Sequence, residues 1–206
     1  MSYLKQRYLI GGIPLIKKER NTLETKISIK LSDEKGAEES KINTGIGFFD
    51  HMLTLFSFHS ELYIEVIADG DLEVDGHHTV EDVGILLGEA IRDLYKQKES
   101  YLRYGSMYLP MDESLARVVL DLSGRPHLNM QTNFSKGTVG SFDVELVEEF
   151  FTAMAMNSKM TLHIDLLKGG NTHHEIEAIF KGFARALKQA LQSVDGGVPS
   201  SKGLIS

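Results

Sequence analysis

The chain has no cysteine among its 206 residues, few prolines, and fewer basic than acidic residues. The lack of cysteine excludes disulfide bonds and thiolate metal sites, and it fits the reducing cytoplasm. No apolar run approaches the roughly 20 residues that a membrane-spanning helix requires. The formal net charge of -7 provides no general attraction for nucleic acid or anionic membranes, so a phosphorylated ligand would need local basic residues. These features predict a cytoplasmic protein without a nucleic-acid or membrane partner.

Two copies of a short motif stand out, each with two adjacent histidines followed by a glutamate. The copies are His77-His78 with Glu81, and His173-His174 with Glu177. On a helix, residues three and four apart share a face, so each glutamate lies beside its own histidines. Adjacent helical residues point about 100° apart, so one pair can serve two different metals. Imidazole and carboxylate together suit manganese, iron or zinc.

The motifs belong to a longer internal repeat. With an offset of 96 residues, the apolar positions Val80, Val83, Leu87, Ile91 and Leu94 fall on Ile176, Ile179, Phe183, Leu187 and Ala190. With an offset of 98 residues, an upstream helix and the strand after it also superimpose. A lone histidine pair is usually an ordinary polar helix start, but a pair repeated with its glutamate favours a shared chemical role. The repeat predicts a duplicated half-domain.

The upstream helix adds a third candidate ligand to each half. His51 lies beside an apolar helix stripe, and its repeat counterpart is Glu149. Each half then offers one ligand from its first helix and three from its second. Eight ligands are enough for two metals with four protein ligands each, and catalytic sites leave a coordination position open.

We expect an α+β fold with a mostly antiparallel sheet and two helices in each half, and with the helices packed between the two sheets. Residues 1–18, which have no repeat partner, are expected to be an extension outside the fold. Residues 19–206 are expected to form one catalytic unit. It would contain half-repeats at about 19–102 and 103–194, followed by a turn-rich tail at 195–206.

Several segments together resemble the imidazoleglycerol-phosphate dehydratase family, from about Glu19 to the C-terminus. These segments are Phe49-Asp50-His51-Met52-Leu53, Asp75-Gly76-His77-His78-Thr79-Val80-Glu81-Asp82, Ser123-Gly124-Arg125-Pro126, His173-His174-Glu175-Ile176-Glu177-Ala178 and Pro199-Ser200-Ser201-Lys202-Gly203. The resemblance implies dehydration of imidazoleglycerol phosphate to imidazoleacetol phosphate in histidine biosynthesis. It also implies two Mn²⁺ ions per active site. A homo-oligomer is implied too, an octahedral assembly of about two dozen subunits with sites where subunits meet.

The resemblance also implies roles for individual residues. One metal would be held by His77, His173, Glu177 and Glu149, and the other by His51, His78, Glu81 and His174. Glu24 would reach the substrate as the acid/base, with His51, His77, Glu81 and Glu177 as the other catalytic residues. The implied phosphate-binding residues are Arg103, Arg125, Lys181, Ser201 and Lys202. The chain departs from some members at two positions, with Glu149 in place of histidine and Leu55 in place of glutamine.

Two other functions remain open on the residues alone. A dinuclear metallohydrolase acting on a small phosphorylated substrate would use the same ligands, but it would release inorganic phosphate. A metal-storage or metal-scaffolded shell would bind metal and assemble without needing Glu24, Arg103 or Arg125. His59, His127 and His163 have no matched partners and are expected to be ordinary core or surface residues.

Overall fold

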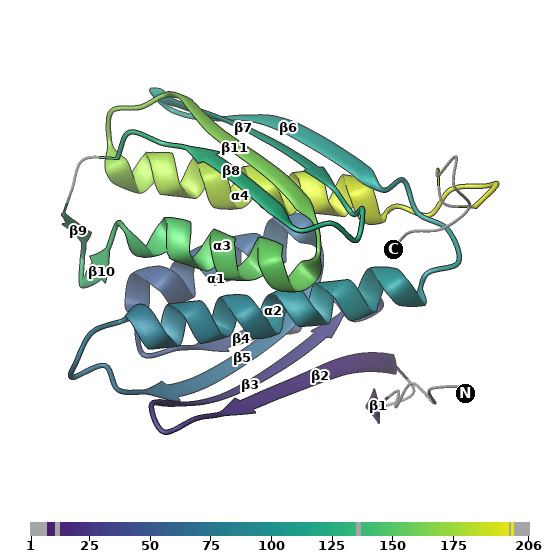
Figure 1. The fold of residues 1–206 in the computed structure, drawn as a ribbon, viewed down its shortest axis with the longest axis horizontal. Helices are drawn as coiled ribbons and strands as arrows, with labels where there is room; N and C mark the ends of the chain where they lie inside the picture. Colours follow the sequence, from purple (N-terminus) through teal and green to yellow (C-terminus); the bar gives the residue numbers. More distant parts are fainter. Residues whose placement is uncertain (1–7, 11–12, 135–136, 198, 200–206) are drawn as a thin grey trace.

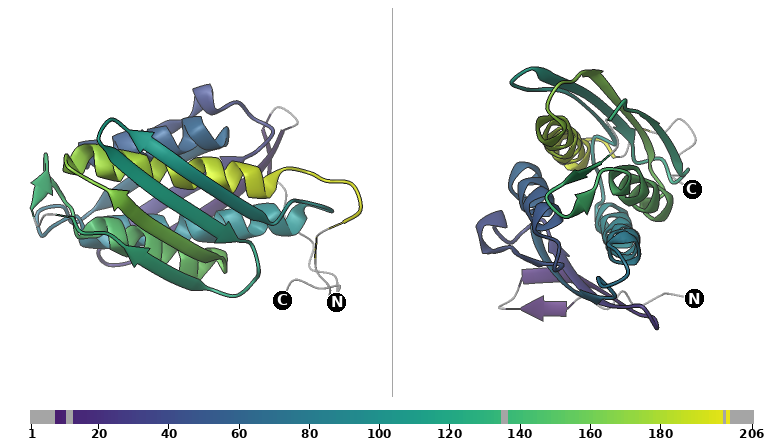
Figure 2. Two further views of the ribbon diagram at one scale, coloured as in Figure 1. Left: turned by 90° about the horizontal axis from the view of Figure 1, so that it is seen from above. Right: turned by 90° about the vertical axis from the view of Figure 1, so that its left-hand side faces the viewer.

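The computed structural model describes residues 8–10, 13–134, 137–197 and 199. It contains two β-sheets with four helices packed between them (Figures 1 and 2). The first sheet has the order β1 (Tyr8–Ile10), β2 (Ile13–Asn21), β3 (Thr25–Ser32), β5 (Tyr63–Gly70) and β4 (Lys41–Asn43). The second has the order β6 (Tyr104–Met111), β7 (Ser114–Asp121), β11 (Thr161–Lys168) and β8 (His127–Gln131). The helices are α1 (Gly47–Ser60), α2 (His77–Gln97), α3 (Leu146–Ser158) and α4 (Thr172–Leu191).

Three minor elements complete the described fold. A 3-10 turn, η1 (Ala37–Glu39), precedes β4, and the short strands β9 (Thr138–Val139) and β10 (Phe142–Asp143) pair with each other before α3. Among the described residues, no helix has both the length and the apolar character needed to cross a membrane.

The two sheets share one topology, which confirms the predicted duplicated α+β fold. In the first, β3 pairs antiparallel with both β2 and β5, and β4 runs parallel to β5. In the second, β7 pairs antiparallel with both β6 and β11, and β8 runs parallel to β11. The repeat extends to backbone detail, because Glu61 after α1 and Lys159 after α3 end their helices in the left-handed conformation, with φ of 60° and 59°.

The helices pair across the two halves rather than within them. α2 packs on α3, and α1 packs on α4 (Figure 2). Glycine permits the close approach of α2 to α3, since a Cβ at Gly88 would lie 2.6 Å from the carbonyl oxygen of Met154. Aromatic side chains fill the other contact, where the rings of Phe56 and Phe183 stack with centroids 5.4 Å apart. Each fully buried apolar side chain of this kind contributes about 1.5–3 kcal/mol.

Residues 13–18, which the sequence analysis placed in an extension, are strand residues in the structure. These residues form the first part of β2, which pairs with β3 from Ile16 onward, and Leu15 is only 3% exposed. Strand β2 has a structural counterpart in β6, but the two strands share too few residue types for the sequence repeat to reveal it. Strand pairing requires backbone hydrogen bonds and side chains that alternate between a buried and an exposed face. Many different residue types meet both requirements.

Candidate metal-binding site

The structure brings six of the eight predicted ligands into two groups of three. One group is His77, Glu81 and Glu149, and the other is His51, His173 and Glu177. Within each group, one donor atom from each residue lies within 4.8 Å of the other two. The groups are repeat counterparts, because each combines the first-helix ligand of one half with two second-helix ligands of the other half.

The cross-packing of helices explains this grouping. α3 lies against α2 and delivers Glu149 to His77 and Glu81, while α1 lies against α4 and delivers His51 to the second group. Within one chain, Glu177 therefore lies apart from His77 and Glu149, with which the resemblance grouped it, so that grouping would require residues of a second subunit. The repeat shows which residues are equivalent, but it does not show which helix faces which.

Glu177 is the most constrained member of the two groups. It is 6% exposed, and its Oε1 lies 2.9 Å from His51 Nε2 and 3.2 Å from His173 Nε2. The Lys181 ammonium donates to Oε2 at 2.5 Å. Burial by itself raises the pKa of Glu177, but the hydrogen bonds from Lys181, His51 and His173 outweigh it and lower the pKa to about 2. The site thus keeps an ionised carboxylate beside two imidazoles, a donor set suited to a divalent transition metal.

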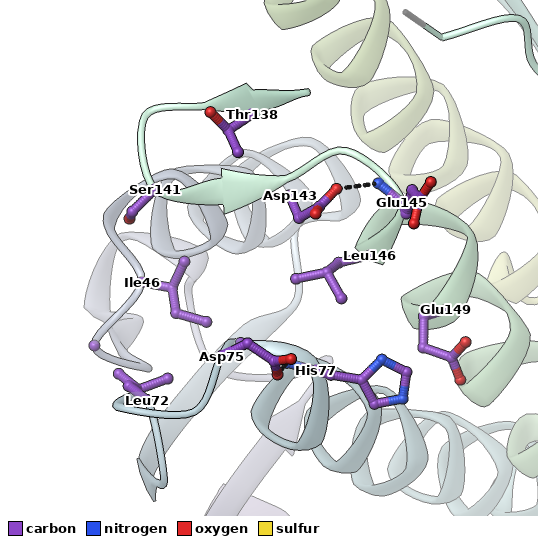
Figure 3. Close-up of a pocket in the computed structure, with 12 residues that line it drawn as sticks. Ile46, Leu72, Asp75, His77, Thr138, Ser141, Asp143, Glu145, Leu146 and Glu149 are labelled. Carbon is purple, nitrogen blue, oxygen red and sulfur yellow. Dashed lines mark hydrogen bonds between the residues drawn. The ribbon is translucent and has the colours of Figure 1, made fainter. Parts of the chain in front are cut away.

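A pocket of about 550 Å³ opens beside the first group (Figure 3). His77 and Glu149 point toward one another across it from α2 and α3, and Leu146 forms part of its apolar lining. Asp75 lies just before α2, where its carboxylate accepts the backbone N–H of His77 at 2.7 Å. The N-cap position of the helix itself is occupied by Gly76.

The two remaining histidines of the motifs lie outside both groups, and His174 belongs to a third group with Asp112 and Glu113. The Nδ1 atom of His78 is 3.0 Å and 3.2 Å from the two carboxylate oxygens of Asp71, and this contact raises the pKa of His78. The Nδ1 atom of His174 lies 3.2 Å and 3.3 Å from the carboxylate oxygens of Glu113. Sequence reasoning missed both acidic partners. Asp71 lies in the loop before α2, but Glu113 lies in the distant β6–β7 turn, so the sequence offered no common signal for the two.

Glu24 lies at the same end of the molecule, in the turn between β2 and β3. Its side chain is exposed, and its Oε2 is 3.8 Å from His78 Nε2. The hydroxyl of Thr22 accepts the backbone N–H groups of Glu24 and Thr25, which shapes the turn. Glu24 therefore stands beside the histidines without a short hydrogen bond to His78.

Two of the predicted phosphate-binding residues meet in a second cluster. Arg103, which is 9% exposed, donates to both carboxylate oxygens of Asp121, at 2.7 Å and 3.0 Å. Its third contact is a donation to the carbonyl oxygen of Pro199 at 2.8 Å. Arg125 is more exposed and lies 3.7 Å from the same aspartate. This cluster has the chemistry of an anion site, with Arg125 as the freer cation.

The other three predicted phosphate-binding residues lie elsewhere. Lys181 belongs to the metal-ligand end, where it bonds to Glu177 and contacts the sulfur of Met111 at 3.6 Å. Ser201 and Lys202 fall outside the described residues. His127 and His163, which the sequence left without a role, lie together on the second sheet with ring centroids 5.7 Å apart.

The arginine cluster and the histidine groups lie at opposite ends of one chain. The histidines begin α2 and α4, whereas the backbone N–H of Arg103 donates to the carbonyl of Ala190 near the end of α4 (Figure 1). A helix rises 1.5 Å per residue, so Glu177 and Ala190 are about 20 Å apart along α4.

Comparison with known proteins agrees with this architecture. The family model described as imidazoleglycerol-phosphate dehydratase matches residues 44–187. Imidazoleglycerol-phosphate dehydratase of Staphylococcus carnosus is 59% identical over 191 residues, covering 92% of this chain and 98% of the relative. The protein of the same name from Staphylococcus aureus strain JH9 is 56% identical over 192 residues, covering 93% and 99%.

Solved structures show the same fold. The crystal structure of imidazoleglycerol-phosphate dehydratase from Staphylococcus aureus matches with a TM-score of 0.80 at 51% identity, covering 87% of this chain and 99% of that one. The Pyrococcus furiosus structure, solved in complex with (S)-C348, matches with a TM-score of 0.79 at 36% identity, covering 91% and 99%. The chain therefore belongs to the imidazoleglycerol-phosphate dehydratase family, the hydro-lyases of histidine biosynthesis.

Proposed function

We propose that this chain dehydrates imidazoleglycerol phosphate to imidazoleacetol phosphate with two Mn²⁺ ions per active site. The observation that supports this most is the pair of repeat-related groups, each with three metal-binding side chains. Both groups combine imidazole nitrogen with carboxylate oxygen, and the group with two glutamates is the richer in oxygen. Such mixed sets suit manganese, although iron and zinc accept them too.

The proposed ligands are the six grouped residues together with His78 and His174. The six are His51, His77, Glu81, Glu149, His173 and Glu177. When bound, the ions supply Lewis-acid activation of the substrate's imidazole ring. The ionised Glu177, with its pKa lowered to about 2, is ready to bind a cation without first losing a proton.

Glu24 is the proposed acid/base of the reaction. A group that moves a proton must come within hydrogen-bond distance of the reacting atom. Glu24 is exposed on a short turn and has no short hydrogen bond with the neighbouring His78, so its carboxylate is free to meet a substrate. Arg103 and Arg125 would bind the phosphate and orient the substrate, with Lys181, Ser201 and Lys202 as further proposed contacts.

A complete active site would need more than one chain. The substrate spans only about 10 Å, given bond lengths of ~1.5 Å. Along α4, Glu177 and the carbonyl that binds Arg103 are separated by about 20 Å. We therefore propose that metal ligands of one subunit meet phosphate-binding residues of another. A closed homo-oligomer, such as an octahedral assembly of about two dozen subunits, would repeat this contact on every chain. A cytoplasmic location is part of the same proposal.

The reaction product tests the proposed chemistry directly. Purified protein with Mn²⁺ and imidazoleglycerol phosphate should form imidazoleacetol phosphate without releasing inorganic phosphate. Phosphate release without the keto product would identify the metallohydrolase instead. A large metal-loaded particle that leaves the substrate unchanged would identify the metal-scaffolded shell.

Metal removal should break the assembly into smaller oligomers. If ligands from different subunits meet at each ion, the free energy of metal binding also stabilises the assembly. Light scattering before and after treatment with a chelator measures this directly, and added Mn²⁺ should restore the original mass. An unchanged mass after full metal removal, verified by elemental analysis, would contradict the proposal.

Arg125→Ala should raise the KM for the substrate while the metal content stays normal. A charge-assisted hydrogen bond contributes about 1.5–3 kcal/mol, so we expect an increase of roughly tenfold to more than a hundredfold. Steady-state kinetics measure the change. The matched control is Arg117→Ala, which removes an arginine paired with Asp165 at 3.0 Å on the same sheet. Wild-type kinetics in Arg125→Ala would show that Arg125 does not bind the substrate.

Arg103→Ala should combine a raised KM with lower stability. Unlike Arg125, Arg103 is buried and holds Asp121 through two hydrogen bonds, so its loss leaves that carboxylate without its main partner. Thermal unfolding separates the two variants, because Tm should fall in Arg103→Ala and stay near the wild-type value in Arg125→Ala.

A further inference from the structure

We infer that Asp71 and Glu113 are positioning residues, which hold the Nδ1 atoms of His78 and His174 so that the Nε2 atoms are free to bind metal. The inference rests on the metal dependence proposed above. It concerns two carboxylates outside the groups formed by His77 and by His51: Asp71 belongs to no candidate group among the described residues, and Glu113 lies in a third group with Asp112 and His174.

Asp71 is placed to fix the ring of His78. Its two carboxylate oxygens lie 3.2 Å and 3.0 Å from Nδ1, within hydrogen-bond range. The backbone of Asp71 is itself held, because its N–H donates to the carbonyl of Glu24 at 3.2 Å and its carbonyl accepts the N–H of Val74 at 2.9 Å. An ionised carboxylate only accepts hydrogen bonds, so this contact selects the tautomer with the proton on Nδ1. The lone pair on Nε2 then remains available.

Glu113 does the same for His174 from a different element. It lies in the turn between β6 and β7, and its carboxylate oxygens are 3.3 Å and 3.2 Å from Nδ1 of His174. Its Oε1 also accepts the backbone N–H of Asn171 at 2.8 Å, while the side chain of Asn171 caps α4 by accepting the N–H of His173 at 2.9 Å. The glutamate thus ties the hairpin to the first turn of the helix that carries the histidine.

Carboxylates that accept a hydrogen bond from a metal-binding histidine fix the ring orientation and raise the basicity of the other nitrogen. Glu113 has the fixed position that this role needs, because its Oε1 accepts the backbone N–H of Asn171 and both of its carboxylate oxygens face Nδ1 of His174.

The internal repeat shows how this arrangement differs between the halves. In the β2–β3 hairpin Asn21 pairs with Lys26, and in the β6–β7 hairpin Pro110 pairs with Leu115. The common offset of 89 residues makes Glu24 the counterpart of Glu113.

The two hairpin glutamates have different tasks because their surroundings differ. Asp71 has Gly170 as its counterpart, because the register shift between Leu166 and Lys168 raises the offset that relates the end of β5 to the end of β11 from 98 to 99 residues. The second half therefore lacks a carboxylate at that position. The glutamate in its β6–β7 hairpin contacts Nδ1 of the histidine instead. In the first half Asp71 occupies Nδ1 of His78, which leaves Glu24 free for the substrate.

The test measures Mn²⁺ affinity by equilibrium dialysis on the assembled protein, with wild type alongside Asp71→Asn, Asp71→Ala, Glu113→Gln and Glu113→Ala. Removing such a partner typically weakens metal affinity by roughly 10- to 100-fold. We expect that loss for one of the two ions in the alanine variants, with a smaller loss in the amide variants, which keep an acceptor. All variants should still reach the wild-type number of ions at saturating Mn²⁺.

Asp112→Asn is the matched control. Asp112 is the sequence neighbour of Glu113 and belongs to the same group, but its carboxylate is exposed and its Oδ2 lies 3.8 Å from His174 Nδ1, beyond hydrogen-bond distance. It should bind Mn²⁺ as the wild type does. Unchanged affinity in both alanine variants would overturn the inference, and so would the complete loss of one ion in Glu113→Ala, which would make Glu113 a direct ligand. A wild-type protein that binds no Mn²⁺ would instead refute the proposed metal dependence.

Discussion

Glu149→Ala is expected to leave about one tightly bound Mn²⁺ per chain and to abolish turnover. The substitution removes one of the three donors in its group and leaves His77 and Glu81 without the ligand from α3. Loss of a direct ligand should weaken Mn²⁺ affinity by more than the roughly 10- to 100-fold expected for loss of a residue that only contacts a ligand. Elemental analysis of the dialysed protein measures the metal, and a dehydration assay measures turnover.

Two companion variants give this experiment its controls. Glu148→Ala removes the adjacent carboxylate, which is exposed on the same helix and belongs to neither group, so it should bind both ions and remain active. Glu149→His replaces one metal-binding side chain with another and should retain both ions with partial activity. Two tightly held ions per chain in Glu149→Ala would show that this glutamate is not a ligand.

Co-assembly of two impaired variants should restore activity at low substrate concentration if sites are shared between subunits. Glu24→Gln removes the proposed acid/base at one end of the chain, and Arg125→Ala weakens phosphate binding at the other. In a particle that contains both variants, some sites would combine an intact Glu24 from one chain with an intact Arg125 from another. Random mixing of equal amounts would produce up to about a quarter of wild-type sites.

The measurement compares particles co-expressed with two different tags against a mixture of separately purified particles. Activity at subsaturating substrate should recover only in the co-expressed sample. In the control mixture, the separately assembled particles do not exchange subunits immediately after mixing. Activity no higher than the average of the two parents in co-expressed particles would mean that one chain supplies both residues. That outcome would contradict the shared site while leaving the family assignment in place.

The helices that carry the ligands were predictable because their signals are local. Helical spacing of apolar residues marks the segments that start at His77 and His173, and the same residues are buried in the structure. Strand β2 was missed for the opposite reason, since its place in the fold depends on pairing with β3 and not on a repeated pattern of its own.

Contacts between side chains distant in the sequence were not predictable in the same way. The pairing of His51 with Glu177 spans 126 residues, and it exists because α1 packs against α4. The acidic partners Asp71 and Glu113 were invisible as functional residues, because many exposed turns contain an acidic residue. Their role becomes apparent only when their carboxylates are seen beside Nδ1 of His78 and His174.

By itself the sequence determined the duplication, the helices, the candidate metal-ligand types and the family, because each is a property of residue order along the chain. The tertiary structure decided which ligands meet. It placed Glu149 with His77 and His51 with Glu177, through helices that cross between the halves. It also put Arg103 at the far end of α4 from the histidines. Helix packing sets these distances through the shapes of whole surfaces, which no short sequence pattern records.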